Sequence, residues 1–250
     1  MNFSGLSDRS LLGRLMRFPL RLIPSGARIP VIQGPLRGKQ WIAGSSNHGC
    51  WLGSYEYAKQ KAFSAAIRRG YCVYDLGANV GFYSLLASVL VGPEGRVFSF
   101  EPVPRNLEFL RRHLELNGAS NCSVWDVAVG RSVGTANFDL GPNASMGHLA
   151  VESNGTLSVR TVTLDSLVAS GKLPPPNLIK CDIEGGEYDA LMGASDILVK
   201  HGPTIFLATH GPEVHQQCCR LLADLHYELT PLDELSLDHA SEVLAIRQKR

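Results

Sequence analysis

The sequence predicts an open α/β sheet with helices on both faces, and two stretches of the chain carry that prediction. Residues 72–101 read as an apolar strand, a glycine-containing turn, an apolar helix and a second strand, with an acid at the end of each strand. Residues 177–187 again show a strand, two glycines and the start of a helix. Strands that alternate with helical patterns are typical of βαβ units and a parallel sheet.

The turn after the first of these strands has the features of a ligand site. Gly77 and Gly81 allow the backbone to approach a bound molecule closely, because glycine has no Cβ and tolerates positive φ. The N–H groups at the start of the following helix can face polar ligand groups. Glu101 follows Gly81 by 20 positions, where a carboxylate can accept both hydroxyls of a ribose. The sequence therefore predicts a nucleoside-containing ligand at this turn.

The turn differs from the dinucleotide fingerprint G-x-G-x-x-G, because it lacks the third glycine. An acid within the turn is poorly placed beside a pyrophosphate, but it suits a cationic ligand that carries an amino group and a sulfonium. We therefore expect S-adenosylmethionine (SAM) rather than NAD, bound by Asp75, Gly77, Asn79, Gly81 and Glu101. An NAD-dependent oxidoreductase is the alternative, and a titration with both ligands separates the two.

The composition excludes some classes of protein. The chain has 250 residues, of which 44% are apolar and 19% charged, as in an ordinary globular protein. The net charge of +1 gives no overall field toward nucleic acid, so we expect no nucleic-acid partner. No run approaches the roughly 18 apolar residues that span a bilayer, and no signal peptide is evident. The six cysteines form no C-x-x-C pair, so we expect reduced thiols in a cytoplasmic protein.

The first 50 residues differ in charge from the rest. They carry a net +6, which leaves −5 for residues 51–250. We expect residues 1–50 to form a basic N-terminal arm with a small β-like extension, including a strand near residues 40–43, ahead of a ligand-binding domain at 51–250. Two interpretations of residues 1–30 stay open. In one, a basic amphipathic segment touches an anionic membrane or a partner, and in the other an arm packs on the main domain.

Two further acids are candidates for the cofactor site. Glu56 stands at the start of a helix expected over about 55–69, where it either caps the cofactor or acts as an ordinary acid at a helix N-terminus. Asp126 lies in the second half of an expected third strand, Cys122–Val129. The end of that strand flanks the base of a bound nucleotide, so Asp126 either accepts from an adenine amine or faces water.

Residues 130–165 read as a β-rich insertion, with strands near 136–139 and 157–162. Between them, residues 141–156 form an expected loop, and loops of this length often bind ligands. Ser145, Met146 and His148 are its candidates to face a substrate.

The second informative stretch places two carboxylates at the end of a strand. Asp182 and Glu184 are expected to share a strand face because side chains alternate, at the sheet edge where ligands bind. They are candidates for Mg²⁺ ligands, for a general base, and, for Asp182, for a partner of the cofactor amine. The alternative is structural, with Glu184 capping the glycine turn.

His210 ends the next expected strand, before a Gly-Pro turn, so it is a candidate to take a proton near neutral pH. The alternative is a structural histidine. One helix is expected over 187–200 and another over 213–225, and two last strands, 227–232 and 242–248, are expected to form a hairpin at one sheet edge.

Four motifs in order carry a resemblance to a known family: YDLGANVGFYS, FSFEP, TLDSL and LIKCDIEGGEYDAL. Over about residues 53–211 the sequence resembles the FkbM family of SAM-dependent methyltransferases. The resemblance implies the Rossmann-like class I methyltransferase fold, a mostly parallel seven-stranded sheet with an antiparallel C-terminal hairpin and helices on both faces. Residue by residue, it places Asp75, Gly77, Asn79 and Gly81 in the SAM loop, Glu101 on the ribose, and Asp182, Glu184 and Gly185 in a D-x-E-G motif.

The resemblance also implies a reaction, which is O-methylation of a hydroxyl on a sugar, polysaccharide or natural product. A base or metal is then needed, because an alcohol is a poor nucleophile until its proton is removed. We expect His210 as the base, with Asp182 and Glu184 as further candidates for base or Mg²⁺ ligand. Similar sequences often carry a Glu where this chain has Ala208, so no acid there supports His210. The alternative function is a non-catalytic SAM- or nucleotide-binding module that acts through its basic N-terminal segment.

Overall fold

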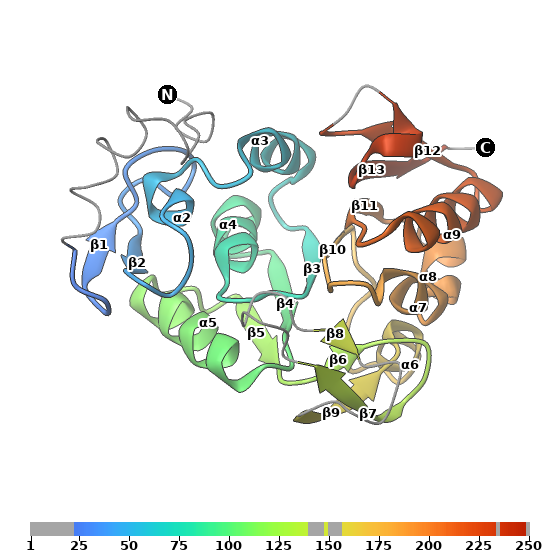
Figure 1. Cartoon of the computed structure of the whole chain (residues 1–250), viewed down its shortest axis with the longest axis horizontal. Coiled ribbons are helices and arrows are strands. Elements are labelled where there is room, and N and C mark those ends of the chain that lie inside the picture. Colours follow the sequence, from blue (N-terminus) through green and yellow to red (C-terminus); the bar gives the residue numbers. More distant parts are fainter. Residues whose placement is uncertain (1–22, 140–147, 150–156, 234–235, 249–250) are drawn as a thin grey trace.

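A seven-stranded sheet forms the centre of the molecule (Figure 1). The computed structural model describes residues 23–139, 148–149, 157–233 and 236–248. The strand order is β12-β13-β11-β10-β3-β4-β5, and β13 runs antiparallel to both of its neighbours while β11, β10, β3, β4 and β5 are parallel. The expected sheet and its C-terminal hairpin are therefore confirmed. The strands are β3 (Cys72–Leu76), β4 (Arg96–Phe100), β5 (Cys122–Trp125), β10 (Leu178–Cys181), β11 (Thr204–Ala208), β12 (Tyr227–Pro231) and β13 (Glu242–Arg247).

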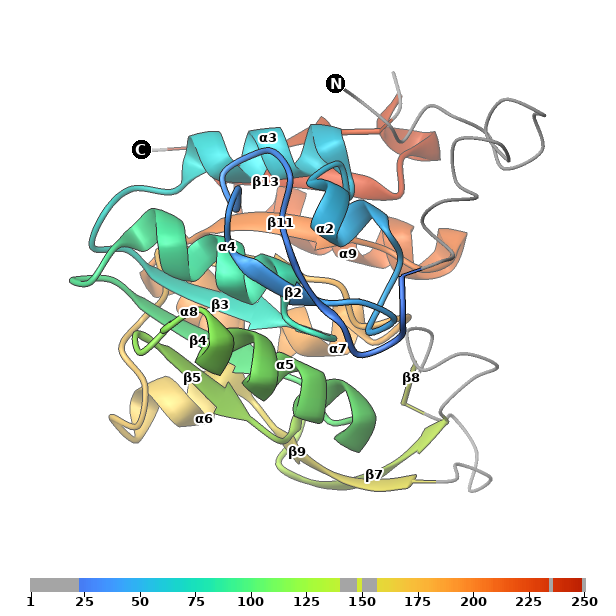
Figure 2. The same cartoon turned by 90° about the vertical axis from the view of Figure 1, so that its left-hand side faces the viewer.

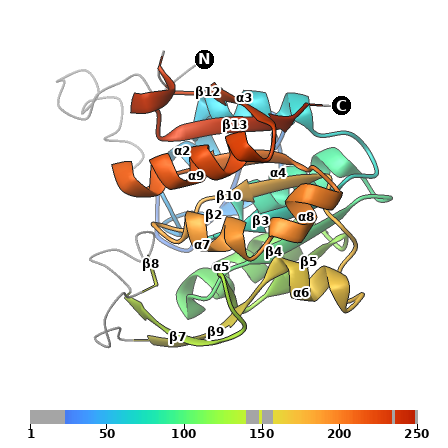
Figure 3. The same ribbon diagram turned by 90° about the vertical axis from the view of Figure 1, so that its right-hand side faces the viewer.

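Helices cover both faces of this sheet, and each face has its own apolar core. Side chains alternate along a strand, so Val73 of β3 packs toward one set of helices and its neighbour Tyr74 toward the other. One face carries α3 (Tyr57–Ala66), α4 (Phe82–Val91) and α5 (Pro104–Leu116), as Figure 2 shows. The other carries α6 (Leu164–Ala169), α7 (Glu187–Met192), α8 (Ser195–Lys200) and α9 (Pro212–Asp224), as Figure 3 shows.

A small N-terminal extension packs against α5. It consists of β1 (Arg28–Pro30) and β2 (Gln40–Ile42), which pair antiparallel, and the short helix α2 (Gly49–Leu52). Trp41 is fully buried and stacks on His113, with ring centroids 3.7 Å apart. The Ile42 N–H donates to His113 Nε2 at 3.1 Å, and His113 Nδ1 lies 2.7 Å from the carbonyl of Val80. Burial lowers the pKa of His113 to about 4, so the ring is neutral at pH 7.

Two expected elements are divided in the structure. The third strand ends at Trp125, and β6 (Ala128–Val129) joins a separate four-stranded sheet, β6-β9-β7-β8, with β7 (Gly134–Asp139), β8 (His148–Leu149) and β9 (Leu157–Val162). The helix expected over 187–200 is interrupted at Gly193. A Cβ on Gly193 would lie 2.1 Å from the carbonyl oxygen of Gly130, so the close approach of that loop requires glycine.

Other features bear on the remaining expectations. A short 3-10 helix, η3 (Leu237–His239), lies between β12 and β13 in the chain. All six cysteines are free thiols. Within the described ranges no helix has both the length and the apolar character needed to cross a bilayer, and the cytoplasmic location stays a prediction.

Candidate active site

A cavity of about 900 Å³ opens at the carboxyl ends of β3, β4, β10 and β11. In this sheet β3 is the strand from which the chain proceeds to β4 on one side and later returns as β10 on the other. Ligands of open α/β sheets bind at such a switch point. Most of the lining comes from the turns that follow the four strands and from residues 44–47 of the N-terminal extension. Residues 55–56, 127–129 and 241–242 complete much of the rest.

The turn after β3 adopts a backbone that demands glycine at two positions. Gly77, Asn79 and Gly81 have φ of 71°, 49° and 95°, all in the left-handed region. A Cβ on Gly77 would lie 1.9 Å from the backbone oxygen of Asp182, and one on Gly81 would lie 2.6 Å from the Leu110 side chain. Any side chain at Gly77 would therefore separate the turn from the segment that follows β10.

Glu101 is held rigidly beside this turn. Its Oε2 accepts the N–H of Asn79 at 2.8 Å, and its Oε1 accepts the N–H of Val103 at 2.9 Å and the amide of Asn106 at 3.3 Å. Burial raises the pKa of Glu101, although the hydrogen bonds oppose that shift. A carboxylate has about four lone-pair sites, so Glu101, which lines the cavity, keeps acceptor capacity for a ligand.

Asp75 lies behind the turn and does not line the cavity. The carboxylate is fully buried, accepts the Ser84 hydroxyl at 2.6 Å and lies 3.4 Å from the ammonium of Lys180. Lys180 in turn donates to the carbonyl of Gly77 at 3.1 Å. Asp75 therefore acts on the turn through Lys180.

Two buried lysines hold Asp182. Its Oδ2 lies 3.3 Å from Lys59 Nζ and 3.5 Å from Lys180 Nζ. Lys59 also pairs with Glu56 at 3.2 Å and with Glu242 at 2.7 Å. Burial by itself would raise the pKa of Asp182, but the two ammonium groups outweigh burial and hold that pKa well below its usual range. Burial raises the pKa of Glu242 to about 7.

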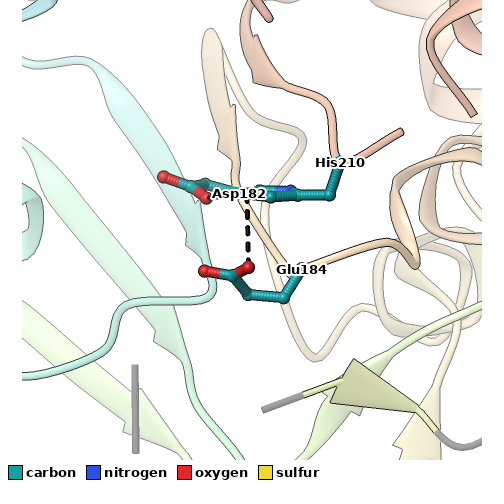
Figure 4. Close-up of side chains that lie close together, drawn as sticks. All are labelled: Asp182, Glu184 and His210. Atoms are coloured by element: carbon teal, nitrogen blue, oxygen red, sulfur yellow. Dashed lines mark ion pairs between the residues drawn. The ribbon is translucent and has the colours of Figure 1, made fainter. Parts of the chain in front are cut away.

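His210 is the centre of a second cluster. Its Nδ1 lies 2.9 Å from Oε1 of Glu187, a fully buried acid at the start of α7. The same Glu187 oxygen accepts the N–H groups of Ile183 and Gly185, at 3.2 and 3.0 Å. On the other side of the ring, Nε2 of His210 lies 3.3 Å from Oε2 of Glu184 (Figure 4). The hydrogen bond to Glu187 raises the pKa of His210 against the opposing effect of burial.

Asp182 and Glu184 converge on His210, although not by the predicted geometry (Figure 4). Strand β10 ends at Cys181, so Asp182 and Glu184 both lie beyond the strand. The prediction that the two acids share one face of a strand is therefore wrong. Glu184 has φ of 56°, a left-handed conformation that is rare for a residue with a side chain. Strain of this kind is concentrated at functional sites.

The same three residues offer ligand atoms within 4.8 Å of one another. Mg²⁺ prefers oxygen ligands, and one of the three offers nitrogen. The Asp182 carboxylate is also already paired with two ammonium groups. The described residues therefore do not support the expected Mg²⁺ site.

Comparison with known proteins places the chain in a family. A family model described as the methyltransferase FkbM domain matches residues 75–235. The chain belongs to the FkbM methyltransferase family. It is 29% identical over 126 residues to the hexuronic acid methyltransferase AglP of Haloferax volcanii, a match that covers 50% of this chain and 51% of AglP. The chain thus spans about half the length of this curated relative.

Solved structures agree on the fold. The FkbM methyltransferase of Methylobacillus flagellatus superimposes with a TM-score of 0.50 at 19% identity, over 80% of this chain and 55% of that one. A putative rRNA methylase of Clostridium thermocellum also gives 0.50, at 13% identity, over 78% and 92% of the two chains. The FkbM protein described here therefore has the Rossmann-like methyltransferase fold.

The remaining predicted residues have different outcomes. Glu56 lines the cavity, accepts the Tyr83 hydroxyl at 3.0 Å and has φ of 42°. Asp126 is exposed, lies outside the lining and pairs with Arg160 at 2.7 Å. Ser145 and Met146 lie outside the described residues, and His148 begins β8.

Four residues of this FkbM site were not predicted from the sequence. Glu187 had a signal, because it stands in the run D-x-E-G-G-E, and Lys180 is a charge within an otherwise apolar strand. Lys59 and Glu242 had none, since 183 positions separate two residues that pair at 2.7 Å. Position 208 carries Ala where similar sequences often carry Glu, so no acid at that position supports His210. In this structure Glu187 of α7 is the acid that contacts His210.

Proposed function

We propose that this FkbM protein transfers a methyl group from SAM to a hydroxyl of a sugar-containing acceptor. One observation carries the proposal: a single cavity joins the glycine turn and Glu101 to His210. Glu101 suits the ribose diol, and the N–H groups near the start of α4 suit polar groups of the ligand. Bound SAM would supply an electrophilic methyl group on a sulfonium.

The charges of the cavity fit that cofactor. Five carboxylates line the cavity and only two side chains of Lys or Arg do, namely Glu56, Glu101, Asp182, Glu184 and Glu242 against Lys180 and Arg105. An excess of carboxylates favours a ligand with an ammonium and a sulfonium, because opposite charges attract strongly where water is excluded. The same excess disfavours the pyrophosphate of NAD.

His210 has the arrangement of a general base. When Nδ1 carries its proton toward Glu187, Nε2 is left as the proton acceptor. Nε2 faces Glu184 and Asp182, at 3.3 and 3.8 Å. When the hydroxyl of the methyl acceptor gives its proton to Nε2, His210 becomes a positively charged imidazolium. The two carboxylates stabilise that charge as it forms. Glu187 orients the ring, and no step of the proposal requires a metal.

Two observations support a sugar acceptor. The relative AglP is a hexuronic acid methyltransferase by name. The cavity is also lined by small polar side chains that suit a molecule with many hydroxyls, namely Ser45, Ser46, Asn47, Thr209 and Ser241.

Calorimetric titration with SAM, S-adenosylhomocysteine (SAH) and NAD tests the cofactor, and transfer of a labelled methyl group to neutral and uronic-acid oligosaccharides tests the reaction. We expect binding of SAM and SAH but not of NAD, and label in the oligosaccharide. Binding of NAD in place of SAM contradicts the proposal. SAM binding without transfer to any hydroxylated acceptor would instead favour the non-catalytic module.

A further inference from the structure

The N-terminal extension presents cations without acids. Residues 23–55 contain Arg28, Arg37 and Lys39 and no Asp or Glu. Arg28 and Arg37 are exposed, and Lys39 is half-buried. None of the three forms an ion pair with a carboxylate of the described residues. Their charges are therefore uncompensated on this part of the surface.

Helix α5 continues the basic surface. Strand β2 and the loop after it run along this helix from its C-terminal to its N-terminal end (Figure 2), because Gln40 bonds to Asn117 at 2.7 Å and Ser45 accepts from Arg105 at 3.3 Å. Arg105 and Arg112 are exposed, and the guanidinium of each lies near the ring of Phe109, at 5.1 and 5.9 Å from its centroid. Among the described residues Glu108 pairs with Arg112, at 3.6 Å, and with no other cation.

An exposed apolar side chain belongs to the same hairpin segment as Arg28, Arg37 and Lys39. Ile32, just after β1, is 53% exposed, one of few large apolar side chains exposed in the described residues. Pro30 and Pro35 beside it are exposed as well. Cations around an exposed apolar residue are typical of proteins that bind at the interface of an anionic bilayer. A nucleic-acid site needs the cations but gives no reason for the exposed Ile32.

We propose that this basic hairpin surface, formed by Arg28, Ile32, Arg37 and Lys39 with Arg105 and Arg112, docks on an anionic membrane. The chain that precedes it has the matching character in its sequence, since residues 1–22 contain four Arg and one Asp among Leu, Met and Phe. The surface also borders the cavity, which residues 44–47 and Arg105 line. Docking would thus place the cavity mouth close to the bilayer.

Sedimentation of the full chain with vesicles tests the proposal. We expect binding to vesicles of phosphatidylcholine with 30% phosphatidylglycerol, little binding to phosphatidylcholine alone, and loss of binding in high salt because salt screens exposed charges. The triple variant Arg28→Gln, Arg37→Gln, Lys39→Gln should partition about a hundredfold less, since each cation near such a surface contributes about fivefold. Ile32→Ser should weaken binding several-fold without changing its salt dependence.

A matched triple variant, Lys172→Gln, Lys200→Gln, Arg220→Gln, removes the same charge from exposed positions outside this surface. It should leave vesicle binding nearly unchanged, and unchanged thermal unfolding midpoints would show that every variant folds. Equal losses in both triples, or no binding of the wild-type chain to the anionic vesicles, overturns the proposal. Binding of a single-stranded RNA without vesicle binding assigns the surface to nucleic acid and overturns it as well. No outcome depends on methyl transfer.

Discussion

The two halves of the cavity are built in different ways. The half that suits SAM comes from one continuous stretch, residues 72–106, which supplies the glycine turn and Glu101. The half around His210 is assembled from α3, β10, α7, the turn after β11, and β13. These segments contribute Lys59, Lys180, Glu187, His210 and Glu242, so His210 follows its strand by two residues and does not end it as expected. Local sequence determines the first half, whereas the sheet topology determines the second.

The halves differ in electrostatics as well. Glu101 forms no ion pair with another of the described residues and instead accepts from N–H groups, and burial raises its pKa. Asp182 is clamped by two lysines that lower its pKa. Substitutions on the SAM side should therefore change affinity for the methyl donor, and those around His210 should change turnover.

The largest effect is expected at His210. His210→Ala removes the proposed base, so kcat should fall by ~10²–10⁴, while the SAH affinity measured by calorimetry stays within about threefold. The control is His201→Ala, because His201 is an exposed histidine that follows α8. This variant should leave both kcat and SAH affinity unchanged. Unchanged turnover in a variant that still binds SAM would remove His210 from the mechanism.

The next largest effect is expected at Glu101. Glu101→Gln replaces an acceptor of two backbone N–H groups by an amide with a single acceptor oxygen, so one buried donor loses its partner. Charged hydrogen bonds contribute about 1.5–3 kcal/mol, which corresponds to roughly ten- to a hundredfold weaker SAH binding in calorimetry. Glu108→Gln, on the exposed face of α5, should bind SAH normally. If Glu101→Gln bound SAH normally and lost only turnover, the assignment of Glu101 to the SAM half of the cavity would be contradicted.

Glu187→Gln should change the pH dependence. A base must be unprotonated, so kcat/KM rises with pH through the pKa of His210, which Glu187 raises. Gln weakens that effect, and the rising limb should move to lower pH while kcat at its plateau falls about tenfold as the ring loses its charged partner. The Gln oxygen can still accept from the N–H groups of Ile183 and Gly185. A uniform loss of rate with an unmoved limb, in stopped assays from pH 5 to 9, would indicate a purely structural role.

The contrast between the halves also explains what the sequence could predict. The turn of Gly77–Gly81 and the acid at Glu101 depend on residues close in the chain, and both formed where the pattern indicated. Lys59 and Glu242 acquire their roles only when α3 and β13 meet at the carboxyl edge of the sheet, and no local pattern contains that contact. The strand geometry predicted for Asp182 and Glu184 was wrong because β10 stops at Cys181. After that residue the N–H groups of Ile183 and Gly185 donate to the side chain of Glu187, and these bonds stabilise a turn instead of a longer strand.

The smallest effect is expected at Asp126, which also tests where the SAM half ends. Its strand was expected to continue to Val129, but β5 stops at Trp125, and Asp126 turns outward to an exposed pair with Arg160. Exposed pairs contribute about 0–1 kcal/mol, so Asp126→Ala should change SAH affinity less than twofold and leave the free energy of unfolding within about 1 kcal/mol. Arg160→Ala should match it in both measurements. A tenfold loss of SAH affinity in Asp126→Ala alone would show that the loop rearranges on binding and that the acid does reach the adenine.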